Sequence, residues 1–213
     1  GIGQGKTMLT RLRERAGIDG PGPIDISARI SYAQALLDHR QIDQGVSELI
    51  WLWRNVEPGT DLRMTPLPML TQMVVESHPQ NVGAFTKLRD ELTAQTEAPT
   101  ADPATMNRWA LLTAVLGNDD LILAWHKKHA ADASPEQLKE MLPWVELAMA
   151  FANRWAELGR LYPDPLAVVA ERQAELKNDL DEQLKSAAPG QVEEIRRDVL
   201  QKFYQRLDRK SVV

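Results

Sequence analysis

SARISYAQALLDHRQIDQGVSELIWLWRNVEP, residues 27–58, decides the predicted fold. Its first half spaces apolar side chains as one face of a helix does, and Ser27 stands before them as a candidate N-cap. The polar DHRQ at 38–41 supplies a turn, and Pro58 ends the second half. The apolar face of the first helix is Ile30, Ala33 and Leu37, and that of the second is Ile42, Val46, Leu49, Ile50 and Trp53. Two amphipathic helices folded back on each other are predicted.

A tryptophan lies on the polar side of the second helix. Trp51 shares that side with Gln44, Glu48 and Asn55. An aromatic side chain among polar ones is either covered by a neighbouring helix or left exposed as a contact, and exposed aromatics anchor interfaces. These four residues are therefore the predicted partner-binding residues.

Similar units follow this one along the chain. Helix-breaking clusters at 57–61, 98–103, 132–135 and 162–165 recur every 30 to 41 residues, the length of a helical hairpin. The predicted helix pairs are 65–77 with 80–95 and 103–116 with 119–130; in the fourth unit Pro143 either starts a helix over 143–161 or kinks a single long one. Bulky residues recur in the first halves (Tyr32, Met69, Trp109, Trp144) and aromatic residues in the second halves (Trp51, Phe85, Trp125, Trp155). Most of the six tryptophans are predicted to be core, with Trp53, Trp109 and Trp155 on apolar stripes.

Different segments flank this array. Residues 1–23 hold a short helix from Lys6 to Ala16, closed by Gly17, and a Gly/Pro linker. Residues 163–213 hold a charged helix with Leu166, Val169, Leu176, Leu180 and Leu184 along one side, and a last helix near 191–207. Their narrow seams resemble coiled-coil faces, so we expect an antiparallel pair packed on the array, which could cap the array or dock a partner or a second copy of the chain. The predicted domains are 1–23, 24–162 and 163–213.

The 27–58 unit resembles a tetratricopeptide repeat. The residues that carry the resemblance are Ala33, Leu36, Ile42, Gly45, Leu49, Leu52 and Pro58. Arg40 replaces the usual glycine of the turn, Gly45 replaces the more usual alanine, and Ile122 of the third unit replaces a small residue. The resemblance implies an all-α solenoid of antiparallel hairpins with a groove that binds a peptide or protein, and it carries no catalytic residues.

Composition bounds the functions further. The net charge of −5 argues against affinity for nucleic acid, whose phosphates attract cationic surfaces. The chain has no cysteine, which excludes disulfides and thiolate chemistry but leaves the compartment open, with the cytoplasm slightly favoured. No apolar run approaches the roughly 18 residues of a membrane span, so we expect a soluble chain. Because the sequence begins at Gly1, we expect it to be a piece of a longer protein.

Two motifs resemble ligand-binding sites, but neither is complete. GIGQGKT at 1–7 ends like a phosphate-binding loop, but the first glycine of that motif would fall before Gly1. His126 and His129 stand three apart on a predicted helix, with two lysines between them and no third ligand in view, which favours a surface pair over a metal site. No cofactor or metal is predicted.

Clusters of charged residues on a predicted helix usually form a face that is exposed to solvent. Paired carboxylates such as Asp119 and Asp120 lie at helix starts or on charged faces, so no catalytic residue is predicted. Basic residues near the C-terminus, from Arg196 to Lys210, are interleaved with acidic ones and support a nucleic-acid role only weakly. The predicted function is a non-catalytic module that binds a peptide or protein. The alternative is a structural or regulatory helical domain, attached to an upstream enzyme or mediating homodimerisation.

Overall fold

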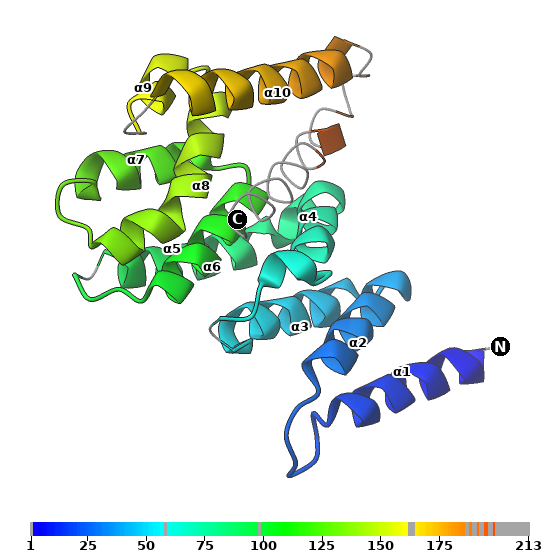
Figure 1. Ribbon diagram of the computed structural model, residues 1–213. Helices are drawn as coiled ribbons and strands as arrows, with labels where there is room; N and C mark the ends of the chain where they lie inside the picture. The colour runs from blue at the N-terminus through cyan, green and yellow to red at the C-terminus, as the bar shows by residue number, and fades with distance from the viewer. Residues whose placement is uncertain are drawn as a thin grey trace. The chain divides into compact units, whose positions relative to one another are not determined.

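The computed structural model describes residues 2–57, 59–97, 99–161, 165–185 and the single positions 188, 191, 194, 195 and 198, and most of these residues are helical. Ten α-helices and two short 3-10 helices occur in these segments, and no strand does (Figure 1). The predicted all-α class is therefore confirmed. Within the described residues, none of the helices has both the length and the apolarity to cross a membrane.

The chain divides into two compact units, and each is described by itself. The division falls between Gly117 and Asn118, inside the third predicted hairpin. The first unit holds α1 (Ile2–Ala16), α2 (Ile26–Asp38), α3 (Ile42–Asn55), η1 (Leu62–Met64), α4 (Leu67–Ser77), η2 (Pro79–Asn81), α5 (Val82–Thr96) and α6 (Pro103–Val115). The second unit holds α7 (Asp119–His129), α8 (Pro135–Phe151), α9 (Trp155–Gly159) and α10 (Pro165–Lys185).

The start of α2 corrects the predicted N-cap. Asp25, not Ser27, is the cap residue, and its carboxylate accepts the backbone N–H of Ala28 at 3.0 Å. A carboxylate satisfies an unpaired amide at the positive end of the helix and also opposes the helix dipole, which a serine hydroxyl does less strongly. Ser27 lies inside the first turn, where its carbonyl accepts the hydroxyl of Ser31.

The turn between α2 and α3 is built on Arg40, at the position where the tetratricopeptide pattern has glycine. Arg40 adopts a left-handed φ of 60°. Its N–H donates to Leu37 O at 3.0 Å, and the N–H of Gln41 donates to Leu36 O at 2.9 Å, which is a Schellman motif. The short polar loop therefore ends α2 and turns the chain back, as the sequence predicts.

Helices α2 and α3 pack against each other. The small residues that the sequence singles out lie in this contact, because Ala33 and Gly45 are both buried. A Cβ built on Gly45 would come within 2.6 Å of Leu37 Cδ2 and 2.9 Å of Leu37 Cγ. The helices thus cross too closely at this point for even one methyl group to enter without movement of Leu37.

Trp53 forms the centre of the first unit. Its side chain is fully buried, and its indole N–H donates to Thr71 Oγ1 on α4 at 2.9 Å. The Thr71 hydroxyl donates in turn to Leu67 O at 2.8 Å. From α6, Arg108 donates to Trp53 O at 3.1 Å and to Val56 O, and so satisfies carbonyls at the C-terminal end of α3. Three helices are therefore joined at one tryptophan.

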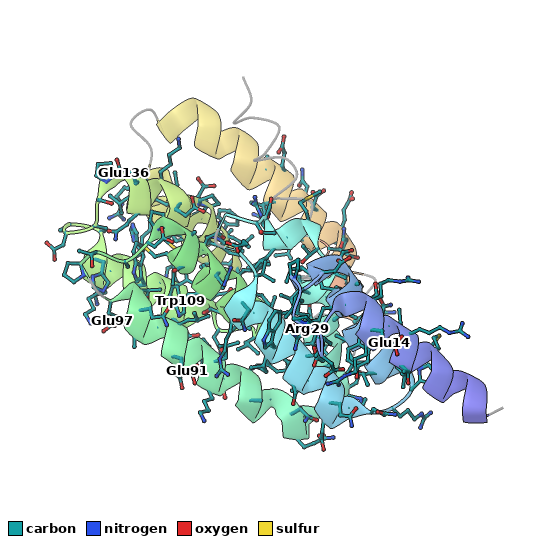
Figure 2. The ribbon with its side chains drawn as sticks, turned by 90° about the horizontal axis from the view of Figure 1, so that it is seen from below. Glu14, Arg29, Glu91, Glu97, Trp109 and Glu136 are labelled. Carbon is teal, nitrogen blue, oxygen red and sulfur yellow. The ribbon has the colours of Figure 1, made fainter. Side chains whose placement is uncertain are left out.

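Helix α5 packs mainly against α6 rather than against α4, its predicted partner. Trp109 of α6 is buried there and donates its indole N–H to Thr93 Oγ1 of α5 at 2.8 Å (Figure 2). The Thr93 hydroxyl donates to Arg89 O, so this contact repeats the tryptophan–threonine arrangement of α3 and α4. The predicted helix ranges are close to those observed, but the pairing of 65–77 with 80–95 as one hairpin is not the dominant packing.

In the second unit, α7 packs against α8. A capping box of Ser134 and Gln137 starts α8. Pro143 lies inside this single helix, which decides between the two predicted alternatives. Helix α8 ends at Phe151 because Asn153 turns the chain with a φ of 57°, so the alternative helix over 143–161 does not form. The predicted last helix at 191–207 lies almost wholly outside the described residues, and with it the predicted terminal pair.

Replacing Gly45 with alanine tests the close crossing of α2 and α3. The added methyl group must displace Leu37, and overpacking of this kind costs about 1–3 kcal/mol. That loss outweighs the gain of up to about 1 kcal/mol from helix propensity. We expect Gly45→Ala to lower the free energy of unfolding in urea titrations. Gly83→Ala is the matched control, because a Cβ at Gly83 in α5 meets nothing within 4 Å; a loss of equal size there would contradict the steric explanation.

Candidate functional site

The four predicted partner-binding residues lie along one stripe of α3, at successive helical turns. Gln44 and Asn55 are exposed, while Glu48 and Trp51 are half-buried. Asn55 donates its side-chain amide to Trp51 O at 2.9 Å, a bond within the helix. The sequence thus places the four residues on a common face of the helix correctly.

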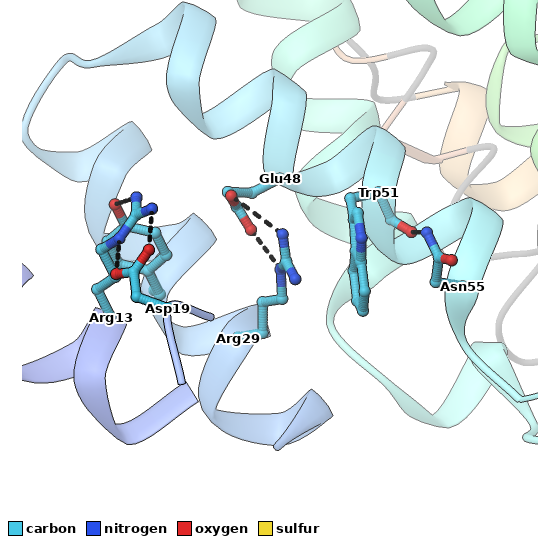
Figure 3. A network of polar contacts seen from close by, with 7 residues as sticks. Arg13, Asp19, Arg29, Glu48, Trp51 and Asn55 are labelled. Atoms are coloured by element: carbon cyan, nitrogen blue, oxygen red, sulfur yellow. Dashed lines mark hydrogen bonds and ion pairs between the residues drawn. The ribbon is translucent and has the colours of Figure 1, made fainter. Parts of the chain in front are cut away.

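Trp51 is covered on one side by an arginine that the sequence analysis did not single out. The guanidinium carbon of Arg29, on α2, lies 3.5 Å from the centroid of the Trp51 ring system. The same guanidinium forms an ion pair with Glu48, with Arg29 Nε 2.5 Å from Glu48 Oε2 (Figure 3). The Arg29 side chain is only 7% exposed and that of Glu48 14%. Arg29 therefore lies between a carboxylate and an aromatic face, with both of its partners on α3.

This arrangement changes the interpretation of Trp51. A buried guanidinium is costly unless a carboxylate neutralises it and a polarisable surface covers it. Glu48 supplies the charge, and the Trp51 ring supplies a cation–π contact. Trp51 is thus engaged inside the first unit, and only the part of its ring that Arg29 leaves uncovered can meet another molecule. A signal was present in the sequence, since Arg29 shares a helical stripe with the buried Tyr32 and Leu36.

A second surface was not predicted. Three methionines close together in the chain are exposed: Met64 by 79%, Met69 by 45% and Met73 by 44%. Met69 and Met73 are one turn apart on α4, and Met64 ends η1, just before α4 begins. We call these three residues the methionine face. Its apolar side chains point to solvent. Met69 differs in this from the other bulky residues that recur in the first halves of the units, because Tyr32, Trp109 and Trp144 are buried.

The opposite side of α4 explains why these methionines are exposed. Leu67, Leu70, Thr71 and Val74 are all buried, and they follow one helical stripe. Residues two positions before and after Thr71 are rotated by about 200° from it at roughly 100° per residue, so they point away from the core. With Thr71 held inward by Trp53, Met69 and Met73 must face outward. Helix α4 is therefore apolar on both sides.

Few charges border the methionine face. Within α4 the one ionisable side chain is Glu76, which is exposed and accepts the side-chain amide of Gln72 at 3.1 Å. On η1, Arg63 pairs with Asp61 across 2.9 Å. The surface is thus apolar with an acidic residue toward the C-terminal end of α4.

The histidine pair of α7 is less exposed than the sequence suggests. His126 is half-buried, and the His129 ring lies 5.8 Å from that of Trp125, tilted by 36°. Burial lowers the pKa of His126 below its usual 6.5, opposed by the charge of Glu157 on α9. No group of three His, Cys, Asp or Glu residues suited to a metal ion occurs in the part of the chain that the structure describes. The prediction of a surface pair is only partly correct, since both rings are partly covered.

Three other groups of candidate site residues form ordinary helix or helix-end structure. The Gly-Lys-Thr run at residues 5–7 lies inside α1, so its backbone is helical and does not form a phosphate-binding loop. Asp119 and Asp120 occupy the first turn of α7, as predicted. His39 bonds through Nδ1 to Ala35 O at 2.8 Å, the carbonyl-bonded state expected of a histidine at a helix joint. The basic C-terminal cluster from Arg196 lies outside the described residues.

Two further arginines have shifted pKa values. Hydrogen bonds to Asp19 and to the Tyr32 hydroxyl raise the pKa of Arg13, and the bond from Arg13 lowers the pKa of Asp19 (Figure 3). Desolvation lowers the pKa of Arg108, whose Nε is buried without a hydrogen-bond partner. Both arginines join helices, Arg13 from α1 to α2 and Arg108 from α6 to α3. Their surroundings indicate structural roles.

No protein-family model matches this chain, and no curated protein or solved structure matches it at a significant level.

The contact between Arg29 and Trp51 predicts a measurable coupling. A double-mutant cycle of Arg29→Met and Trp51→Leu removes the cation–π contact while keeping apolar bulk at both positions. We expect a coupling free energy of about 0.5–2 kcal/mol in chemical unfolding. Trp51→Phe, which keeps an aromatic face, should cost less stability than Trp51→Leu. Additive single-mutant effects would show that the ring contributes nothing to holding the guanidinium.

The lowered pKa of His126 predicts a pH dependence of stability. Because the folded state disfavours the proton, the unfolded state binds more of it, and the free energy of unfolding falls as pH drops through about 6.5. His126→Gln should flatten that dependence between pH 7.5 and 5.5, measured by urea unfolding at fixed ionic strength. His39→Gln, at the exposed turn after α2, is the control for loss of an imidazole elsewhere, and an equal flattening there would contradict the assignment of the effect to His126. If the free energy of unfolding of His126→Gln depended on pH as that of the unaltered chain does, burial of His126 would not be the cause of the dependence.

Proposed function

We propose that this chain is a non-catalytic protein-interaction module, and that its methionine face binds an apolar segment of a partner protein. The observation that carries the proposal is the exposure of Met64, Met69 and Met73, which lie close together in the chain on the consecutive elements η1 and α4. Contiguous exposed apolar side chains are unusual on a water-facing surface and mark interaction sites. Among the described residues, five large apolar side chains are strongly exposed, and three of them lie here.

Methionine suits this role for a physical reason. Its side chain is unbranched, has three rotatable bonds and ends in a polarisable thioether, so it adapts to partners of different shape. Two such residues one turn apart on α4 provide a pair of contacts matched to apolar side chains at helical spacing on a partner. We therefore assign the occupant as an amphipathic helix with apolar residues at i, i+4 and i+7.

Charge supports one orientation of that partner helix. Glu76 is the one ionisable residue of α4, and it is exposed one turn beyond Met73. A lysine or arginine just past the last apolar residue of the partner would meet this carboxylate if the two helices run parallel. Such an exposed pair adds specificity and association rate more than affinity.

The proposed architecture around this face is a tetratricopeptide-like solenoid of hairpins. Its support is the α2–α3 pair, which crosses at Ala33 and Gly45 and turns on Arg40 with the geometry that the family's glycine provides. The α5–α6 pair is a second packed pair of consecutive helices. Stacked pairs of this kind present an extended surface, and the polar stripe of Trp51, Gln44, Glu48 and Asn55 is a second binding surface within this proposal.

One observation favours the alternative of a structural domain that forms homodimers through its terminal helices. Leu184 of α10 is 40% exposed, at the end of the apolar seam predicted for that helix. Leu176 of the same seam is buried. A single exposed leucine is weaker support than three neighbouring methionines, so dimerisation ranks second.

Designed peptides test the proposal directly. The probe is a helical peptide with leucines at i, i+4 and i+7 followed by lysine, titrated into protein carrying ¹³C-methyl methionine. We expect the methyl signals of Met64, Met69 and Met73 to shift, and Met69→Gln/Met73→Gln to weaken binding at least about tenfold. Met8→Gln is the matched control, because Met8 on α1 is 41% exposed but lies outside the face. Equal weakening by Met8→Gln, or shifts confined to other methyl groups, would refute the assignment.

The charge contact has its own test in the same titration. Glu76→Gln should weaken binding of the lysine peptide a few-fold at low salt and leave binding of a norleucine version unchanged, because only the first has a charge to pair. A loss with both peptides would place Glu76 in a different role.

A further inference from the structure

The seven methionines of the chain fall into two groups by exposure. Those of the methionine face are 44–79% exposed, and Met8 is 41% exposed. The other three are at most 3% exposed, and they lie in α6 (Met106) and α8 (Met141 and Met149). No methionine has an exposure between these groups, so a reagent that attacks sulfur from solvent meets two distinct populations.

The composition of the chain directs such a reagent to methionine. There is no cysteine to be oxidised first. A hydroperoxide is therefore reduced by the thioether sulfur: a sulfur lone pair attacks the terminal oxygen, the S–O bond forms and the O–O bond breaks. With hydrogen peroxide, a proton shift releases one water, the sulfur is oxidised by two electrons and the peroxide is reduced by two. The product is methionine sulfoxide, which reductases convert back to the thioether.

We propose that the methionine face is a site of reversible sulfoxidation by hydroperoxides, and that oxidation there switches off binding of an apolar segment. The second clause rests on the proposed function. Each sulfoxide places a strongly polar, hydrogen-bond-accepting S–O group on a surface whose use is apolar contact. The adaptable side chains that suit binding become ones that must be desolvated before an apolar partner can dock.

Oxidation of the methionine face is expected to leave the fold unchanged, because other residues hold α4 in place. The packing of α4 is carried by Leu67, Leu70 and Val74 on its inner side, and by the hydrogen bond from Trp53 to Thr71. None of these groups is oxidised by hydroperoxide under the same conditions. The methionines that do hold the core, Met106, Met141 and Met149, are shielded from solvent and oxidise only when the surrounding helices open.

The site is tested by peptide mapping with mass spectrometry after limited treatment with hydrogen peroxide. Met64 should oxidise fastest, followed by Met69 and Met73 at rates similar to Met8, and all four at least tenfold faster than the three buried residues. Helical content and melting temperature should stay unchanged until the buried residues react. Equal rates for exposed and buried methionines, or unfolding that accompanies oxidation of the face, would overturn the site.

The switch is tested with the helical leucine–lysine peptide described above. Oxidation of the face should weaken binding at least tenfold, and methionine sulfoxide reductases should restore it. The variant Met64→Leu/Met69→Leu/Met73→Leu conserves side-chain volume and should keep its affinity after the same treatment, whereas Met8→Leu should lose it as the unaltered chain does. Failure of the unoxidised protein to bind the peptide would refute the proposed function while the oxidation map still decides the site. Binding that survives full oxidation of the three residues would overturn the switch alone.

Discussion

The burial of Trp53 is the constraint on which the first unit depends. An indole of this size fills the space between helices, and its N–H must find an acceptor because an unpaired polar group in the core costs about 1–3 kcal/mol. Thr71 supplies that acceptor, and its own hydroxyl is satisfied by Leu67 O. The bond therefore fixes the rotation of α4 about its axis. Everything on the outer side of α4, including the methionine face, follows from which side chain turns inward.

Buried arginines meet the same requirement in two ways. Arg29 is accommodated in the interior because the Glu48 carboxylate pairs with its guanidinium and the Trp51 ring covers it. Arg108 instead turns to the carbonyls at the end of α3, where the negative end of the helix dipole stabilises a cation. Both interactions join helices that are distant in sequence or antiparallel. The contact with Arg29 also engages the Trp51 ring, which would otherwise look like a free binding residue. The polar residues around Trp51 in the sequence therefore do not show whether its ring is free to bind a partner.

Periodicity was enough to predict most of the helices, because apolar spacing and breaker residues are local properties, but the short α9 was not predicted. The α2–α3 hairpin, the turn at Arg40 and the close approach at Gly45 follow from the 27–58 stretch. Which helices pair was not predictable: α5 has an apolar stripe that suits either neighbour, and the bond from Trp109 to Thr93 decides for α6. The exposure of Met69 was not predictable for a similar reason, since α4 is apolar on both sides and periodicity does not show which side packs on the core. The stacking of Arg29 on Trp51 depends on the packing of α2 against α3. The position of Arg29 on a helical stripe with buried residues was the one indication of it in the sequence.

The buried methionines have a packing role, whereas the exposed methionines do not. In α6 and α8 the residue fills irregular core space, and leucine or isoleucine could do much the same. On α4 no packing demand explains an apolar side chain, because the residues that hold the helix face the other way. Leucine there would supply comparable apolar area but would be less adaptable and inert to hydroperoxides. Methionine at the three exposed positions of η1 and α4 therefore contributes to the surface rather than to folding, and it leaves that surface open to chemical change while the core that positions it stays intact.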